Sequence, residues 1–175
     1  MKKYLKLLPL ILYPYMYLIL FIIFLIINNI SGGNAGIENG FFIGIILLIV
    51  YNIYVLCISV YNAVITAKND CKASEAAKIN LIIKGSQIPA YIFNFMVGIL
   101  GILMSVWGIG LIIMVIVLDV LTIILTGISS IGCAIKMNKE RIFSTSGSIL
   151  MAIGSFVFCI DIIIAIVYML KSRKI

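Results

Sequence analysis

The chain has 175 residues, of which 64% are hydrophobic and 11% charged, with a formal net charge of +7 and no histidine. A soluble domain is about half apolar and about a quarter charged, so this composition excludes a soluble globular protein. The lack of histidine excludes histidine bases, histidine metal sites and a histidine pH switch. The sequence therefore predicts a polytopic, all-α membrane protein, with residues 1–175 as a single domain.

The first predicted membrane span covers residues 7–27, because a spanning helix needs about 20 mainly apolar residues. Tyr13, Tyr15 and Tyr17 in this segment are typical of a membrane–water interface. The apolar run is longer than the core of a usual signal peptide, so we interpret it as a span that also directs insertion. Small residues at 31–35 leave cleavage open as an alternative.

Four more apolar segments are long enough to cross a bilayer, which predicts a bundle of five spans. In the third span, Pro89 predicts a kink that leaves the helix continuous, because Gly85 and Ser86 come just before it. The four segments are residues 41–67, 79–104, 108–135 and 147–170.

The 13 Lys and Arg residues lie mainly at the ends of the apolar segments. This placement sets membrane orientation and excludes a nucleic-acid surface. Lys2, Lys3 and Lys6 predict a cytoplasmic N-terminus in the cell membrane.

With five spans, the basic tail at 171–174 lies outside, against the positive-inside rule. The alternative is four spans with a re-entrant third segment, which moves the tail inside and the basic loop at 136–141 outside. Both arrangements place ten basic residues inside and three outside, so the count does not distinguish them. We prefer five spans because the third segment keeps one polar stripe along its whole length.

Polar residues recur every three or four positions in the second, third and fourth segments. This spacing places them on one helix face. Two readings compete: hydrogen bonds that join neighbouring helices, and the lining of a polar cavity. The main stripes are Asn52, Ser59, Asn62 and Thr66; Lys84, Gln87, Tyr91 and Asn94; and Asp119, Thr122, Thr126 and Ser129.

Four polar residues lie near the middle of their segments: Asn52, Asn94, Asp119 and Asp161. At a rise of about 1.5 Å per residue, they share a layer about 10 Å thick near the bilayer midplane. A charged group at this depth costs about 2.5–3.5 kcal/mol and so needs a reason. We predict that these four side chains form one ion- or substrate-binding site, in a cavity open to the cytoplasm.

Lys84 and Gln87 lie between this layer and the cytoplasmic end of the third segment. The expected position of the Lys84 ammonium is at the headgroups, which its long side chain reaches by snorkelling. In the alternative, Lys84 and Gln87 form the cavity mouth and attract an anion.

Two classes of function follow. The first is transport of an ion, proton or small solute through the midplane site, alone, as a homo-oligomer or within a larger membrane complex. The second is a non-catalytic membrane subunit, immunity-type protein or assembly factor. An enzyme is not expected, because neither Asp119 nor Asp161 lies in the GxGD segment of intramembrane aspartyl proteases. No cofactor or metal site is predicted.

Two stretches resemble a family of uncharacterised small bacterial membrane proteins. They are the segment Leu81-Ile82-Ile83-Lys84-Gly85-Ser86-Gln87-Ile88-Pro89-Ala90-Tyr91 and the opening Leu7-Leu8-Pro9-Leu10-Ile11-Leu12-Tyr13-Pro14-Tyr15. The resemblance implies a bacterial membrane protein. It implies no activity and transfers no site residues.

Overall fold

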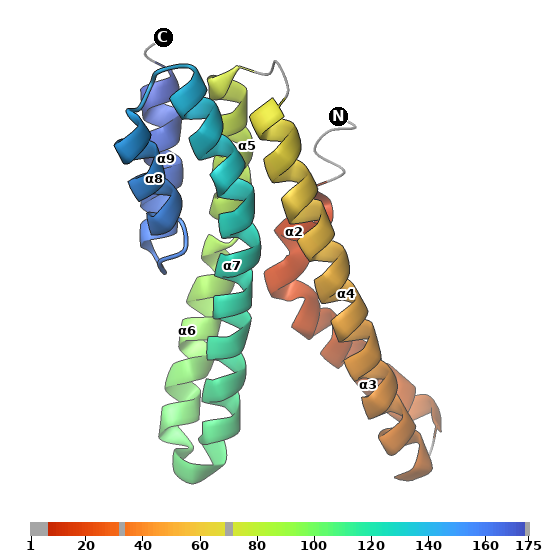
Figure 1. Ribbon diagram of the computed structural model, residues 1–175. Helices are drawn as coiled ribbons and strands as arrows, with labels where there is room; N and C mark the ends of the chain where they lie inside the picture. Colours follow the sequence, from red (N-terminus) through yellow and green to blue (C-terminus); the bar gives the residue numbers. More distant parts are fainter. Residues whose placement is uncertain (1–6, 32–33, 69–71, 174–175) are drawn as a thin grey trace.

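The computed structural model describes residues 7–31, 34–68 and 72–173, and the regular elements in these ranges are all helices (Figure 1). The prediction of an all-α chain is confirmed. The elements are α2 (Leu8–Leu12), η1 (Tyr13–Tyr15), α3 (Met16–Ser31), α4 (Asn34–Lys68), α5 (Ala73–Gly85), α6 (Ile88–Leu103), η2 (Ser105–Gly108), α7 (Ile109–Lys139), α8 (Thr145–Gly154) and α9 (Ile160–Ser172).

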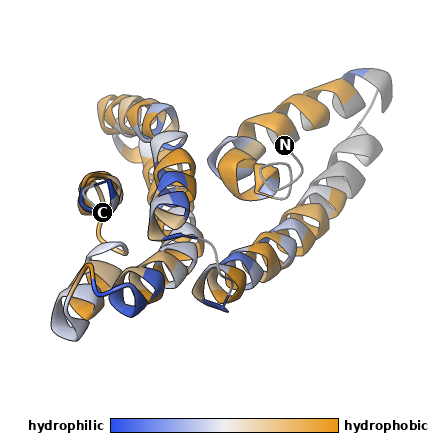
Figure 2. Cartoon of the chain, turned by 90° about the horizontal axis from the view of Figure 1, so that it is seen from above, coloured by the Kyte–Doolittle hydropathy of each residue, from blue (hydrophilic) through white to orange (hydrophobic). Residues whose placement is uncertain are grey.

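Three helices in the described ranges are long and apolar enough to cross a membrane: Ile43–Lys68, Ala73–Leu103 and Ser105–Lys139. Helices α2, η1 and α3 run beside α4 in the opposite direction (Figure 1). Most residues along the helices are hydrophobic (Figure 2). Large apolar side chains are exposed on each long helix, as expected for surfaces that face lipid.

At the predicted kink the structure has two helices, α5 and α6, in place of the one continuous helix that was expected. Helix α5 ends at Gly85, and α6 begins at Ile88 with Pro89 in its first turn, where a missing N–H group costs least. The Ser86 and Gln87 N–H groups still bond to carbonyl oxygens of α5, at 3.0 and 3.2 Å. Helices α5 and α6 therefore follow one another as a single helical segment that is broken at residues 86–87.

The prediction of a fifth span at 147–170 is wrong. The chain turns back after Gly154, so α8 and α9 lie side by side as a helical hairpin that enters and leaves at the same end (Figure 1). At about 1.5 Å per residue, neither helix reaches across a hydrocarbon core of about 30 Å. Cys159 has a φ of 63° and marks the point where the chain reverses into α9.

The reversal places the C-terminal end of the described chain at the same end of the molecule as the ends of α4 and α7 (Figure 1). Lys68, Lys139 and Lys171 therefore share one end of the molecule, the basic end, while Trp107 lies at the opposite end. The alternative with a re-entrant third segment is also wrong, because Ala73–Leu103 is long and apolar enough to cross a membrane and the chain turns back in the fifth segment instead. The N-terminal lysines predicted to set orientation lie outside the described residues.

Packing is concentrated toward the basic end. A methyl group built on Gly132 of α7 would lie 2.4 Å from the Ala63 carbonyl oxygen of α4, so these two backbones are in direct contact. A core cluster there joins α5, α7 and α9 and includes Ala77, Met137 and Tyr168. This contact between α5, α7 and the hairpin positions the polar residues described next.

Candidate functional site

The polar residues in the middle of the bundle form two separate clusters. The first is an ion pair between the Lys84 Nζ of α5 and the Asp161 Oδ2 of α9, 2.8 Å apart, with both side chains 0% exposed. The Lys84 ammonium also donates to the Thr126 Oγ1 of α7 at 2.8 Å and to the Ser155 carbonyl oxygen at 3.4 Å. The pair therefore ties the hairpin to α5 and α7.

Tyr91 and Gln87 complete this first cluster. The Tyr91 hydroxyl lies 3.5 Å from the Asp161 Oδ2 and 3.4 Å from the Gln87 Oε1, so it can donate to either oxygen. Both Gln87 and Asp161 are buried. Because protein atoms surround the charges on every side, this cluster is a closed structural contact.

The expectation that Lys84 snorkels to the headgroups is wrong, and so is the alternative that places Lys84 and Gln87 at a cavity mouth. Both side chains are fully buried. The hairpin, which the sequence presents as a straight span, folds over them and brings Asp161 against the Lys84 ammonium. A lysine with a carboxylate partner inside the protein has no need to reach the interface.

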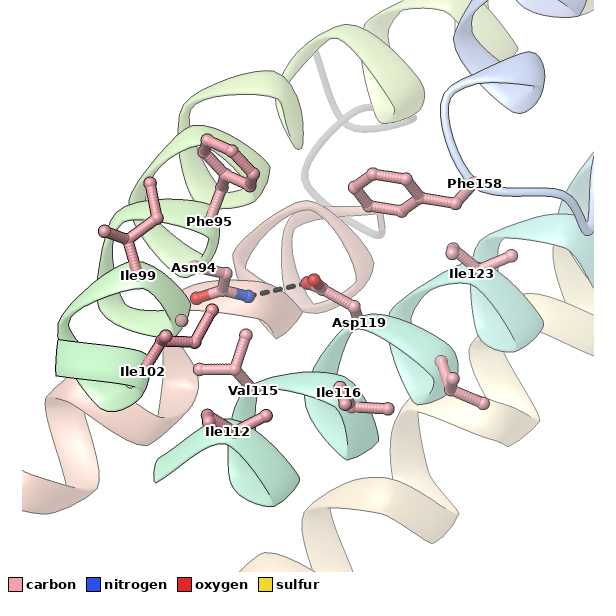
Figure 3. A pocket seen from close by; sticks show the side chains of 12 residues that line it. Asn94, Phe95, Ile99, Ile102, Ile112, Val115, Ile116, Asp119, Ile123 and Phe158 are labelled. Carbon is pink, nitrogen blue, oxygen red and sulfur yellow. Dashed lines mark hydrogen bonds between the residues drawn. The ribbon is translucent and has the colours of Figure 1, made fainter. Parts of the chain in front are cut away.

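The second cluster contains Asp119 of α7 and Asn94 of α6. The Asn94 Nδ2 donates to the Asp119 Oδ1 at 2.6 Å (Figure 3). The Asn94 Oδ1 accepts from the Tyr17 hydroxyl of α3 at 2.7 Å. The Asn94 amide is thus held at both ends and presents its N–H group to the carboxylate. Within the described ranges, no Lys or Arg forms an ion pair with Asp119.

Asp119 and Asn94 lie on the wall of a cavity of about 410 Å³ between α6 and α7 (Figure 3). The rest of the lining is apolar. Phe158, from the turn between α8 and α9, closes the cavity on the side toward the hairpin. The other lining side chains include Phe95, Ile99, Ile112, Ile116 and Ile123.

Asn52 belongs to neither cluster. Its Oδ1 accepts from the Tyr13 hydroxyl at 2.6 Å, and its Nδ2 donates to the Leu48 carbonyl oxygen at 2.8 Å. It lines a different cavity, of about 260 Å³, between the N-terminal helices and α7. Of the four residues predicted to form one site, the structure therefore brings together only Asn94 and Asp119.

The stripes of α4 and α7 form interhelical hydrogen bonds. The Ser59 hydroxyl donates to the Leu125 carbonyl oxygen, and the Asn62 amide donates to the Ser129 hydroxyl. These contacts agree with the packing interpretation of the stripes. The polar groups in these hydrogen bonds are therefore already bonded to a neighbouring helix and do not line a water-filled cavity.

Sequence reasoning missed the part that Tyr17 and Phe158 play. Tyr17 was interpreted as an interface marker, yet its hydroxyl reaches Asn94. Tyr13 and Tyr17 are four residues apart and face the same way, a spacing that could have indicated a shared inward role. Phe158 gave no signal, because its position depends on the reversal at Cys159.

Together the fold and the two clusters define an all-helical chain with three helices able to cross a membrane and one half-open polar site. Within the described part of the chain, no group of three or more His, Cys, Asp or Glu could hold a metal ion. The chain belongs to a family of unknown function, DUF6652, whose model matches residues 3–174. No curated protein and no solved structure matches it.

Proposed function

We propose that this protein is a multi-pass protein of the bacterial cytoplasmic membrane with a transport-linked function, and that Asp119 and Asn94 form its site for an ion, proton or small solute. The observation that carries the proposal is the half-buried Asp119 carboxylate, which lies on a cavity wall with an amide beside it and no basic partner among the described residues. Asp161, by contrast, is already neutralised by Lys84.

The position of Asp119 supports a binding role. It lies ten residues into α7, about 15 Å along the helix axis and so about half of a 30 Å hydrocarbon core. A carboxylate at that depth costs about 2.5–3.5 kcal/mol, and residues that carry such a cost usually line ion or substrate pathways. Secondary transporters also bind their substrates near the midplane.

The proposed orientation places the basic end in the cytoplasm, on the side where the sequence predicts the N-terminus. The support is that Lys68, Lys139 and Lys171 share that end, as the positive-inside rule requires. Single cysteines at Lys139, Lys171 and Trp107, in a chain without other cysteines, test this with a membrane-impermeant maleimide. We expect Lys139→Cys and Lys171→Cys to react from the cytoplasmic side and Trp107→Cys from the other side. Reaction of Lys171→Cys together with Trp107→Cys would restore the five-span arrangement.

The functional experiment uses the purified protein in lipid vesicles, with flux of protons and of small cations followed under an imposed gradient. Asp119→Asn keeps the shape of the side chain and removes its charge, so it should abolish flux. Asp119→Glu, the matched control, should retain part of it. Equal flux through the wild type and Asp119→Asn would remove Asp119 from the proposal.

A second candidate function is a non-catalytic subunit of a larger membrane complex or an interaction protein. The observation that favours it is the apolar, half-open lining of the Asp119 cavity, which a partner helix with a basic residue would fill. In this case gentle purification from native membranes should recover a stoichiometric membrane partner, and Asp119→Asn should release it. A lone chain or a homo-oligomer would favour the transport proposal. The bilayer is the partner common to both candidates, and nucleic acid belongs to neither.

A further inference from the structure

The Asp119 cavity has the chemistry of a site for one particular class of substrate. It combines a carboxylate with almost wholly apolar walls. Inorganic cations prefer several oxygen ligands, and Ca²⁺ takes six or more. Here the Asn94 carbonyl oxygen already accepts from Tyr17, which leaves the Asp119 carboxylate as the one free anionic group on the wall. This set of ligands suits a cation that brings its own apolar surface.

Two aromatic rings near the carboxylate also suit a cation with an apolar surface. Phe95 of α6 and Phe158 of the hairpin turn flank the Asn94–Asp119 hydrogen bond in Figure 3. Tyr91 holds the Phe158 ring in an edge-on contact, with 5.0 Å between ring centroids. The faces of aromatic rings attract organic cations, and the attraction grows when water is excluded.

The volume of the Asp119 cavity and its apolar rim also suit a cation with an apolar surface. A volume of about 410 Å³ falls in the range of about 300–1,000 Å³ that is typical of small-molecule sites. The cavity rim carries exposed apolar side chains, Phe95 and Ile102 among them, on surfaces that suit lipid. A hydrophobic cation concentrates in the bilayer and would meet this opening directly.

We propose that the Asp119 cavity binds a hydrophobic organic cation, such as a quaternary ammonium or phosphonium ion with aromatic substituents. In this inference Asp119 supplies the counter-charge, Phe95 and Phe158 contact the substituents, and Asn94 is a positioning residue for the carboxylate. The inference rests on the proposed function in taking the cavity as the substrate site, and it names the substrate class.

The test is equilibrium dialysis of radiolabelled tetraphenylphosphonium against the purified full chain in detergent, with tetraphenylborate as an anion of matched shape. The wild type should bind the cation saturably and the borate at least tenfold more weakly, about 1.4 kcal/mol. Asp119→Asn should lose this preference, and Asp119→Glu should retain it. Gly98→Leu should block both probes, because Gly98 lines the cavity and a methyl group built there meets no atom within 4 Å.

Equal binding of the two probes, or cation binding that survives in a folded Asp119→Asn variant, would overturn the inference. Folding of each variant is checked by gel filtration and helical circular dichroism. The vesicle flux experiment separates the two proposals. Proton or inorganic-cation flux that needs Asp119, without phosphonium binding, would retain the proposed function and reject this substrate class. Phosphonium binding that needs Asp119, without any flux, would retain the site and reject transport.

Discussion

The two halves of α7 differ sharply in what surrounds them. From Thr122 to Lys139, buried residues face α4, α5 and the hairpin, whereas Val115 is the one buried residue from Ile109 to Leu121. Each half of α7 is associated with one of the two central aspartates. Asp161 packs against the crowded half with Lys84 and Thr126 beside it, while Asp119 belongs to the open half, on a cavity wall.

The difference indicates that a carboxylate in the middle of an apolar helix bundle can have either of two roles. A carboxylate that is fully enclosed and paired with an ammonium fixes the arrangement of helices. A carboxylate held by one amide at the edge of a cavity keeps an unsatisfied charge available to a ligand. Three mutational predictions test this division between a structural aspartate and a functional one.

The largest expected effect comes from breaking the enclosed pair. Lys84→Met removes the ammonium and leaves the Asp161 carboxylate buried without its charged partner, which should cost about 3–5 kcal/mol of unfolding free energy. The measurement is unfolding of the purified protein in mixed micelles, followed by circular dichroism. Asp119→Asn is the matched control in the open half and should change stability by less than about 1 kcal/mol, since it removes no ion pair.

The double variant Lys84→Met with Asp161→Leu separates the charge from the shape of the site. Replacing both members of a buried pair with apolar residues is often neutral or stabilising, so it should recover most of the stability lost in the single variant. If Lys84→Met and Asp119→Asn cost the same, the two aspartates do not differ in the way proposed here.

A smaller effect should come from adding one methyl group in the crowded half of α7 and one on the α6 wall of the cavity beside its open half. Gly132→Ala forces α7 away from the Ala63 backbone and should cost about 1–3 kcal/mol. Gly98→Ala adds the same group on the cavity wall, where no atom lies within 4 Å of it. It should be neutral or stabilise the helix by up to about 1 kcal/mol. Thermal unfolding of the two variants in detergent gives the comparison, and equal losses would mean that the open half is packed as tightly as the other.

The sequence predicted what depends on local pattern. Apolar length predicted the long helices, Pro89 predicted a kink where α5 gives way to α6, and the matched midplane positions placed Asn94 and Asp119 in one site. These features follow from residues within one or two helical segments, so periodicity and composition were sufficient.

The reversal between α8 and α9 could not be predicted in this way. The segment is as apolar as a span, and no proline interrupts it. What distinguishes it is a contact between Lys84 and Asp161, which are 77 residues apart in the chain. The one available signal was the basic tail, which violated the positive-inside rule in the five-span arrangement. The alternative that removes this violation from the tail placed the reversal in the third segment, whereas the chain reverses in the fifth.

The smallest expected effect concerns the hydrogen bond that links the N-terminal helices to the open half. Tyr17→Phe removes the donor to the Asn94 Oδ1 and should cost about 0.5–1.5 kcal/mol of stability. Tyr15→Phe is a close match, because the Tyr15 hydroxyl donates to the Ser86 carbonyl oxygen at the same distance, 2.7 Å. The two variants should therefore unfold alike.

Their functional readouts should differ. Without Tyr17, the Asn94 Oδ1 loses its donor, so the amide that donates to the Asp119 carboxylate is held less firmly. Flux and phosphonium binding that depend on Asp119 should then weaken in Tyr17→Phe and stay near wild type in Tyr15→Phe. If both variants keep full flux and binding, Tyr17 only holds α3 in place. The open half would then act through Asn94 and Asp119 alone, with no contribution from the N-terminal helices.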